Sequence, residues 1–565
     1  MDILTLAPDF SPRTRQRELY RDGSISRRVR VRNLWSELRR AGDTPIVRLG
    51  ENTRMTGHSD DSRTPTRGSE DFELTNDAGE VVQIARFRAD GSLLLTDRQD
   101  VDTPGSRGGR RLTLYSRNGV PVGQWRTAKA FYQQWLKMVV GKKKSIVVSD
   151  SAFVGGMMHS FSSPHASLVH ALHSHHQNET RRTTGLLVER NFLVLSNADN
   201  FDRLAILTKR QRDDLIRDNI GSDNLVAIPN PFHGEPIRSI KPRRRERGVT
   251  VARLSGIKRL DHAVQALAAT THPTPPTLDI YGEGNDRRQI ENKIAELGLN
   301  ESVRLHGHDA KAREQFATSS FSLLTSRSEG QSLMLIESMA SGCIPIAYDI
   351  DYGPSDIITN GVDGFLVTAG DPLALAGALS RFLKMDEEDV MAMRAAAVET
   401  SKRFSAEAVT ARWGKVFYEL TSAPPAPRRG VTANVSAQLV AAEVTDGNIE
   451  LSIRLEIGET EEASWAKLTW IGRRKDVYLR AAMRQSQSDG YLLFTGTLPV
   501  DQLILGPSGF LDLFVDARVG GTRLRKRVAV EPTVTPVAFG DLELYATAHG
   551  NASIRRLANP ATRPV

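Results

Sequence analysis

Two glutamates eight positions apart, Glu329 and Glu337, occupy the segment of this chain that says most about its chemistry. The apolar pattern of residues 333–340 predicts a helix, and Gly330 before it predicts a first turn whose backbone N–H groups are open to an anion. The apolar run that begins at Cys343 predicts a short buried strand. A loop, a helix and a strand in this order are typical of a nucleotide site at the carboxyl edge of a parallel sheet. The spacing of the two acids alone is common by chance, so two acids with no shared task are the alternative.

Arg253 and Lys258, five positions apart, form a second candidate group. They follow a predicted strand and precede a predicted helix, so both side chains can reach the same diphosphate. A departing nucleotide diphosphate needs positive charge to stabilise it, which an arginine and a lysine supply. Two solvated bases at the start of a helix are the alternative.

Two glycine-containing turns lie between these groups in the sequence, Tyr281-Gly282-Glu283-Gly284 and His306-Gly307-His308-Asp309. Each follows a predicted strand, and the first precedes a predicted helix. Glycine lets the backbone of such a turn approach a ligand closely. Either turn alone is weak evidence for a binding site.

Four histidines, His170, His173, His175 and His176, cluster at the end of another predicted strand. Histidine is a common metal ligand, but no carboxylate or cysteine stands at a suitable spacing nearby. Strand alternation would place His173 and His175 on one face and His176 on the other. We therefore predict no metal site here.

The elements that must position these residues form an α/β pattern with an interruption. Strand and helix patterns alternate over 1–50 and 127–240, and again over 241–422, which predicts two doubly wound, Rossmann-like domains. Residues 51–126 instead show short alternating segments separated by Asn-Asp, Asp-Gly and Asn-Gly pairs. This pattern predicts an inserted domain of β-hairpins within the first Rossmann-like domain.

The C-terminal part of the chain has a different pattern. A proline-rich linker is predicted over 423–430. Alternating short strands over 431–545 then predict a β-sandwich-like domain, and residues 546–565 predict a polar tail.

The composition is that of an ordinary globular protein. Of 565 residues, 39% are hydrophobic and 25% are charged, which at this length predicts two to four domains. Cys343 is the one cysteine, so no disulfide framework is predicted. No apolar run approaches the roughly 20 residues of a membrane-spanning helix, and the N-terminus lacks the pattern of a signal peptide. These features predict a cytoplasmic protein.

The positive charge of the chain is unevenly distributed. The net charge is +8, and basic residues cluster at 27–32, 39–40, 142–144 and 243–247. Such clusters suit a polyanionic substrate or the anionic inner face of a membrane. They lack interleaved aromatic residues and contain no nucleic-acid motif, so no nucleic-acid partner is predicted. Solvated surface charge is the alternative.

Residues 328–345 resemble the signature of the family-4 retaining glycosyltransferases, an E-x7-E pair followed by a small-residue helix end and a G-x-P-I strand. Arg253 and Lys258 match the R-x4-K pair of that family, and residues 360–367 match another hallmark. The resemblance implies the GT-B architecture, with two Rossmann-like domains around a cleft. It also implies hexose transfer from a nucleotide-sugar donor without a metal or a further cofactor.

The resemblance implies roles for single residues. Glu329 would lie near the transferred sugar and Glu337 would bind the ribose, while Arg253 and Lys258 would stabilise the departing diphosphate. His173 matches the histidine that contacts the donor sugar from the end of its strand, and His176 is the alternative match. The other implied donor contacts are Gly282, Glu283, His308, Gly330, Gln331, Ser332 and Leu333.

The hairpin insertion and the string over 193–204 resemble one subgroup of the family, the wall teichoic acid enzymes. These are the poly(glycerol-phosphate) α-glucosyltransferases and the poly(ribitol-phosphate) α-N-acetylglucosaminyltransferases. The resemblance implies a UDP-glucose or UDP-N-acetylglucosamine donor and a polyol-phosphate or related cell-wall glycopolymer as acceptor. It also implies a homo-oligomer, because the β insertion can mediate oligomerisation in this subgroup.

The N-terminus departs from the family pattern. Family members usually begin with a strand and a glycine-rich loop on the acceptor side, and neither precedes Asp2. We therefore expect either that the natural chain begins further upstream or that the acceptor site is incomplete. The second possibility favours a non-catalytic partner subunit that binds sugar or polymer. The intact R-x4-K and E-x7-E residues favour an enzyme.

Overall fold

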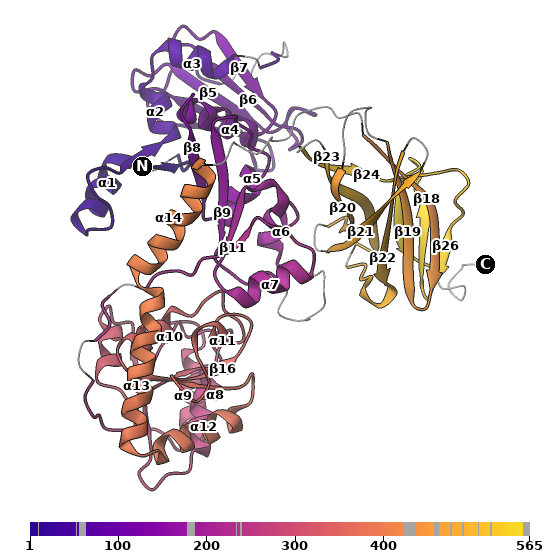
Figure 1. The fold of residues 1–565 in the computed structure, drawn as a ribbon. Helices are drawn as coiled ribbons and strands as arrows, with labels where there is room; N and C mark the ends of the chain where they lie inside the picture. The colour runs from indigo at the N-terminus through magenta and orange to yellow at the C-terminus, as the bar shows by residue number, and fades with distance from the viewer. Residues whose placement is uncertain are drawn as a thin grey trace. The chain divides into compact units, whose positions relative to one another are not determined.

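The computed structural model describes residues 1–565 except 9–10, 52, 56–63, 178–186, 233, 238–239, 423–434, 457–462, 475–476, 489–490, 507, 520–521 and 558–565. The chain forms two compact units, Met1–Ser145 and Ile146–Val565. Each unit combines helices with β-sheets (Figure 1). The linker predicted over 423–430 lies outside the described residues.

The first unit contains a five-stranded antiparallel sheet in which each strand pairs with the next in sequence. Three of its turns pass through Gly79, Gly91 and Gly119, whose φ angles are 79°, 81° and 74°. Positive φ favours glycine, so these residues allow the tight hairpin turns that the sequence predicts. The strands are β3 (Phe72–Thr75), β4 (Val81–Phe87), β5 (Leu93–Arg98), β6 (Arg111–Tyr115) and β7 (Pro121–Trp125).

The other elements of this unit lie on both sides of the hairpins in sequence. They are β1 (Asp2–Thr5), α1 (Pro12–Arg21), β2 (Arg30–Asn33), α2 (Leu34–Arg40), α3 (Asp43–Gly50) and α4 (Ala128–Val140). Strand β1 pairs in parallel with β2 in a sheet of two strands. Trp35 of α2 and Phe131 of α4 belong to one buried cluster with Leu112 and Trp125 of the hairpin sheet.

This packing divides the N-terminal domain predicted from 1–50 and 127–240. The apolar faces of α2 and α4 are buried with the hairpin sheet, so the elements up to α4 belong to the first unit. The remaining elements of the predicted domain belong to the second unit.

The second unit begins with a four-stranded parallel sheet in the order β11-β10-β9-β8. Its strands are β8 (Ser145–Ser149), β9 (Ala166–Leu172), β10 (Arg203–Ile206) and β11 (Leu225–Ala227), and its helices are α5 (Ala152–Met158), α6 (Glu189–Leu195), η1 (Ala198–Asn200) and α7 (Lys209–Arg217). Thr208 caps α7, because its hydroxyl accepts a hydrogen bond from Gln211 N at 3.2 Å. Thr208 and Gln211 stand three positions apart in the sequence, the spacing of a capping box, which predicts this cap.

A six-stranded parallel sheet follows, in the order β14-β13-β12-β15-β16-β17. Its strands are β12 (Arg247–Val251), β13 (Thr277–Tyr281), β14 (Val303–Gly307), β15 (Phe321–Leu324), β16 (Ile344–Asp349) and β17 (Phe365–Thr368). The chain moves outward from β12 to β14 and then returns to the other side of β12 with β15. The carboxyl ends of β12 and β15 therefore border the switch point at which open α/β sheets bind ligands.

Helices pack with this sheet in its buried core. They are α8 (Leu260–Ala269), α9 (Arg287–Glu296), η2 (Ala312–Ala317), α10 (Leu333–Ala340), α11 (Pro354–Ile357), α12 (Pro372–Lys384), α13 (Glu387–Ser401) and η3 (Lys402–Phe404). Helix α10 is the helix that the sequence predicts after Gly330. Cys343 is fully buried, and burial raises the pKa of its thiol to about 12. A last helix, α14 (Ala406–Ser422), returns to the four-stranded sheet (Figure 1). There Val409 and Val416 pack with Val169.

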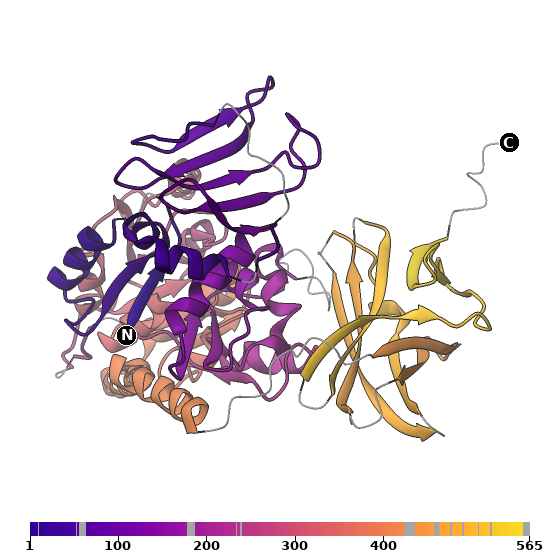
Figure 2. The ribbon, with the colours of Figure 1, turned by 90° about the horizontal axis from the view of Figure 1, so that it is seen from above.

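The C-terminal part is β-rich, as the sequence predicts (Figure 2). Its strands are β18 (Ser436–Thr445), β19 (Asn448–Glu456), β20 (Ala463–Gly472), β21 (Tyr478–Ser488), β22 (Tyr491–Pro499), β23 (Phe510–Val519), β24 (Thr522–Arg527), β25 (Ala529–Val530), β26 (Val537–Phe539), β27 (Leu542–Ala546) and β28 (Ala552–Arg556). They belong to one sheet around a single core. The polar tail predicted over 546–565 is wrong in part, because Ile554 of β28 is buried and β28 pairs with β23 and β27. Residues 558–565 lie outside the described part of the chain.

Candidate active site

The loops that leave β12 and β15 meet at the switch point and bring two predicted residues together. Lys258 Nζ lies 2.5 Å from Glu329 Oε1. Ser326 donates its hydroxyl to the same carboxylate oxygen at 2.7 Å. The side chains of Lys258 and Glu329 retain 25% and 14% of their exposure. The pair is therefore partly desolvated but can still be reached by a ligand.

Backbone contacts hold both loops in place. Thr325 donates its hydroxyl to the carbonyl of Lys258 at 2.8 Å, and Arg327 N donates to the carbonyl of Ile257 at 2.7 Å. The guanidinium of Arg259 donates to the carbonyls of Thr325 and Ser326 at 3.1 and 2.8 Å. The position of Lys258 against Glu329 is thus fixed by the loops and not by the ion pair alone.

Arg253 is exposed, and within the described part of the chain its side chain makes no hydrogen bond or ion pair. Its loop is fixed by the first glycine turn. A Cβ on Gly282 would lie 1.9 Å from the carbonyl oxygen of Ala252, and one on Gly284 would lie 2.0 Å from that of Leu254. These glycines therefore permit a close contact between two protein loops. Because Arg253 is exposed, its guanidinium is available to an anion.

Gly330 brings the loop after β15 against the end of β9. A Cβ at this position would lie 2.5 Å from the carbonyl oxygen of His173, so the two backbones touch. His173 follows β9 directly and is exposed. The structure thus places His173 beside the loop that carries Glu329.

The predicted contacts from Gln331 to Leu333 surround the start of α10. Asn230 N donates to the side-chain oxygen of Gln331 at 2.6 Å, so this amide is occupied by the backbone of another segment. Ser332 is the N-cap residue of α10, but its side chain makes no capping hydrogen bond. The backbone N–H groups of this first turn are the groups that suit an anionic ligand.

Glu337 lies on α10 and is buried. Its Oε1 atom lies 3.2 Å from Nε of Arg313, a residue of η2. The side chain of Arg313 is more than half exposed. Burial raises the pKa of the Glu337 carboxyl, and the positive charge of Arg313 opposes that shift. The sequence contains no signal for this pairing, because Arg313 matches no motif.

The remaining predicted donor contacts lie on the two glycine turns. Glu283 is exposed and forms an ion pair with Arg287 at 3.3 Å. His308 is exposed after β14. Its neighbour His306 stacks on Tyr281, with ring centroids 4.4 Å apart, and lies 2.7 Å from an oxygen of Asp279. The turns therefore adjoin one another, since Gly282 N also donates to the carbonyl of Gly307 at 2.8 Å.

Two other histidines of the cluster, His170 and His176, are buried and pack within the fold. His170 is buried, and its Nδ1 lies 2.9 Å from the hydroxyl of Ser149; burial lowers the pKa of His170 to about 4. His176 is also buried and stacks on Tyr352 with ring centroids 5.6 Å apart. Among the residues that the structure describes, no three metal-ligating side chains form a group that could hold an ion.

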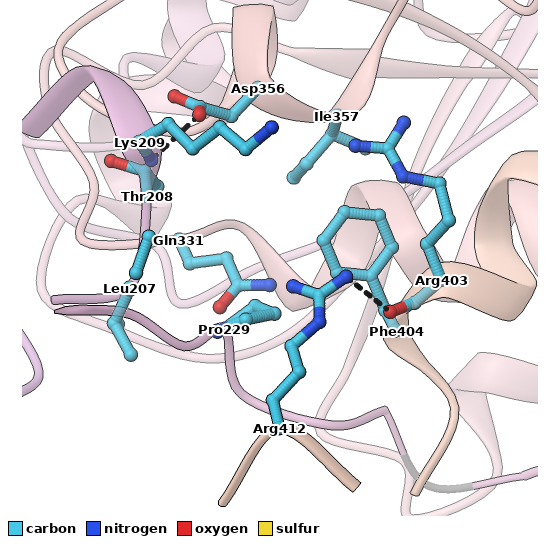
Figure 3. Close-up of a pocket in the computed structure, with 11 residues that line it drawn as sticks. Leu207, Thr208, Lys209, Pro229, Gln331, Asp356, Ile357, Arg403, Phe404 and Arg412 are labelled. Carbon is cyan, nitrogen blue, oxygen red and sulfur yellow. Dashed lines mark hydrogen bonds between the residues drawn. The ribbon is translucent and has the colours of Figure 1, made fainter. Parts of the chain in front are cut away.

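Contacts between the two parallel-sheet parts of the second unit are a feature that the sequence analysis missed. Asp356 of α11 accepts a hydrogen bond from Lys209 N at 2.8 Å, at the first turn of α7 (Figure 3). Arg210 pairs with Asp349 and Asp351 at 3.0 and 2.8 Å. The pocket in Figure 3, which Gln331 and Asp356 help to line, holds only about 40 Å³. It is too small for a nucleotide sugar, because ligand pockets usually span about 300–1,000 Å³.

Comparison with known proteins identifies the part of the chain that carries the candidate site. Residues 237–400 match the family model of the glycosyl transferases group 1. These residues form a glycosyltransferase group 1 domain. The domain contains β12 to β17 and all the predicted site residues except His173.

The chain is similar to proteins with named activities. An exopolysaccharide phosphotransferase of Streptomyces coelicolor is 36% identical over 243 residues, 42% of this chain and 25% of the relative. A poly(glycerol-phosphate) alpha-glucosyltransferase of Bacillus subtilis is 26% identical over 39% of this chain and 33% of the relative. A poly(ribitol-phosphate) alpha-N-acetylglucosaminyltransferase of Staphylococcus aureus is 26% identical over 50% of this chain and 57% of the relative. The chain thus spans at most 57% of the length of these relatives.

Solved structures agree with the predicted fold. The crystal structure of TarM aligns with a TM-score of 0.53 and 20% identity, over 74% of this chain and 91% of that one. The GtfA/B complex aligns with a TM-score of 0.51 and 17% identity, over 75% and 99%. The glycosyltransferase domain and the preceding parallel sheet therefore form the GT-B fold, which confirms the prediction.

Proposed function

We propose that the protein is a retaining glycosyltransferase. It would transfer glucose or N-acetylglucosamine from a UDP-sugar to a hydroxyl of a polyol-phosphate or related cell-wall glycopolymer. The observation that carries this proposal is the contact between Lys258 and Glu329 at the switch point of the six-stranded sheet, where Arg253 also follows β12. The named activities of the B. subtilis and S. aureus relatives support the choice of donor and acceptor.

In this proposal the two cations stabilise the departing diphosphate. Arg253 offers a planar fork of donors that has no partner in the described part of the chain, and Lys258 offers an ammonium that Glu329 now holds. A bound diphosphate would share this ammonium with Glu329, so charge that develops on the leaving oxygen meets donors already in place. The backbone N–H groups at Ser332 and Leu333 would add the field of the α10 N-terminus. The reaction would need no metal ion, because two cations face the diphosphate.

The other residues would position the donor. Glu329 and His173 would hold the sugar. The residue after Glu329, Gly330, touches the backbone of His173. Glu337 would accept hydrogen bonds from the ribose hydroxyls. The family resemblance assigns Gly282, Glu283 and His308 to the nucleotide base, and the two turns that carry them adjoin one another.

We also propose that the protein acts in the cytoplasm at the inner face of the membrane, and as a homo-oligomer. Within the described residues, no helix is long and apolar enough to cross a membrane. Arginines at positions 13, 15, 17 and 21 of α1 would instead attract anionic lipid. Sedimentation with phosphatidylglycerol vesicles tests the first point, and light scattering tests the second. Failure to sediment or a monomeric mass would contradict the respective proposal.

Transfer assays test the proposed activity. The purified full chain is incubated with a panel of UDP-sugars, with and without poly(glycerol-phosphate) or poly(ribitol-phosphate), and released UDP and labelled polymer are measured. We expect UDP release with one or more donors, and its loss in Glu329→Gln. Glu301→Gln, which changes an exposed glutamate outside the site, is the matched control. If none of the UDP-sugars yields free UDP, the protein is a non-catalytic partner and the proposal fails.

A further inference from the structure

The first unit contains a cavity that none of the proposed roles uses. It opens beside β6 and β7 of the hairpin sheet and holds about 500 Å³, within the range of small-ligand pockets. Four arginines line it: Arg54, Arg110, Arg111 and Arg126. We call it the arginine cavity.

Three of these arginines have no carboxylate partner among the residues that the structure describes. Arg110 is neutralised by Asp97, whose oxygens accept from Nε at 2.8 Å and from Nη2 at 2.5 Å. For Arg54, Arg111 and Arg126, the described residues provide no ion pair. Asp102 contributes the one carboxylate of the lining. The cavity therefore has an excess of positive charge that a bound anion would balance.

Arg111 is the most informative of the three. It retains only 7% exposure, and its Nε–H is buried with no acceptor among the described residues. A buried guanidinium without partners is costly, because the group loses water and gains nothing in return. A ligand that reaches Arg111 must be anionic and slender enough to enter the cavity.

We propose that the arginine cavity binds a phosphodiester group of a polyol-phosphate chain. This inference rests on the proposed function, because it assigns a second site to the same acceptor. Guanidinium forks pair with phosphate oxygens through two parallel hydrogen bonds, and phosphodiesters repeat along such a polymer. Trp125, which also lines the cavity, offers an apolar wall to the polyol carbons. An anchored polymer raises the effective concentration of its hydroxyls for transfer.

A phospholipid headgroup carries the same phosphodiester chemistry. The depth of Arg111 favours the polymer, because a flat membrane surface cannot follow a headgroup into a cavity lined on several sides. The test therefore includes both sources. Binding of a short synthetic poly(glycerol-phosphate) to the full chain is measured by calorimetry, and vesicles of phosphatidylglycerol are tested in parallel.

The variants separate the cavity from general surface charge. The double variant Arg54→Gln/Arg126→Gln removes two exposed arginines, and Arg111→Met removes the buried one while keeping an unbranched apolar stem. We expect each to weaken oligomer binding at least about tenfold, because each loses charge-assisted hydrogen bonds. Arg48→Gln, an exposed arginine of α3 outside the cavity, should bind within about twofold of the unchanged protein.

Three results would overturn the inference. The double variant could bind the oligomer as tightly as the unchanged protein, Arg48→Gln could weaken oligomer binding equally, or the protein could bind vesicles but not the oligomer. UDP binding is measured on every variant and should not change, because the loops after β12 and β15 belong to the second unit. If the unchanged protein binds the oligomer but turns over no UDP-sugar, the proposed activity is contradicted and the cavity assignment still holds.

Discussion

Replacing Lys258 with methionine removes the charge at the centre of the candidate site and keeps a side chain of similar length. The ammonium of Lys258 lies 2.5 Å from Glu329 Oε1. The hydroxyl of Thr325 and the backbone N–H of Arg327 donate to backbone carbonyls of the Lys258 loop and hold it independently. The loop should therefore keep its shape in the variant. Glu329 would keep its hydrogen bond from Ser326 but lose its counter-charge.

The expected loss of activity is much larger than the expected loss of stability. Removing one donor from a charge that develops in the transition state lowers kcat by about 10²–10³-fold, or about 3–4 kcal/mol. The pair is neither exposed nor fully buried, with 25% and 14% of the side chains accessible. Its loss should then lower the free energy of unfolding by only about 1–2 kcal/mol, between the values for surface and buried pairs.

The assay measures initial rates of UDP release at saturating donor, together with urea unfolding of each variant. Lys384→Met changes an exposed lysine at the end of α12 and is the matched control. Glu329→Gln and the double variant complete a double-mutant cycle. The loss of activity in the double variant should be smaller than the sum of the losses in the two single variants. A non-additive result means that the two residues act as one unit.

A kcat for Lys258→Met within about threefold of the unchanged enzyme would refute the reasoning, since a lost transition-state donor produces a far larger effect. Lys258 would then serve only to hold Glu329. A large loss of kcat accompanied by global unfolding in the circular dichroism spectrum would also contradict the predicted separation of activity and stability.

Three further predictions concern the surroundings of the site. Gly282→Ala places a Cβ 1.9 Å from the carbonyl oxygen of Ala252 at a φ of 142°, and should destabilise the chain by about 2–4 kcal/mol in urea unfolding; an unchanged midpoint contradicts the close packing. Gly330→Ala places one 2.5 Å from the carbonyl oxygen of His173 and should raise the KM for the donor by forcing the two loops apart, whereas an unchanged KM means that they part freely. His170 has a folded-state pKa of about 4 against 6.5, so the unfolded chain takes up its proton first as the pH falls. Stability should therefore decrease by up to about 3 kcal/mol from pH 6.5 to pH 4, and His170→Gln should lose this component; equal pH dependence in both proteins contradicts it.

Local patterns predicted much of the fold because secondary structure depends on neighbouring residues. The hairpins of β3 to β7 follow from alternating side chains and from glycines that tolerate positive φ. Helix α10 and the Thr208 cap of α7 follow from spacings within a single turn or two. The end of the C-terminal β region was placed too early, because the short strand β28 is stabilised by β23 and β27 and has little signal of its own.

The division of the N-terminal part was not predictable from periodicity. The apolar face of a helix such as α4 predicts that the face is buried, but it does not predict which sheet covers it. Only the tertiary structure decided that α2 and α4 pack with the hairpins, while β8 to β11 receive α14 from the far end of the α/β region. Those choices depend on which surfaces are complementary once the chain has folded.

The sequence by itself determined the chemical groups of the candidate site: two cations, two acids and glycine turns in a fixed order. Tertiary structure decided their partners. Lys258 meets Glu329 across 71 positions, Glu337 meets Arg313, and Gly330 touches His173, because the strand order places β15 beside β12 and the loops close on one another. Residue types and spacings are properties of the chain, whereas distances between distant residues exist only after the sheet has assembled.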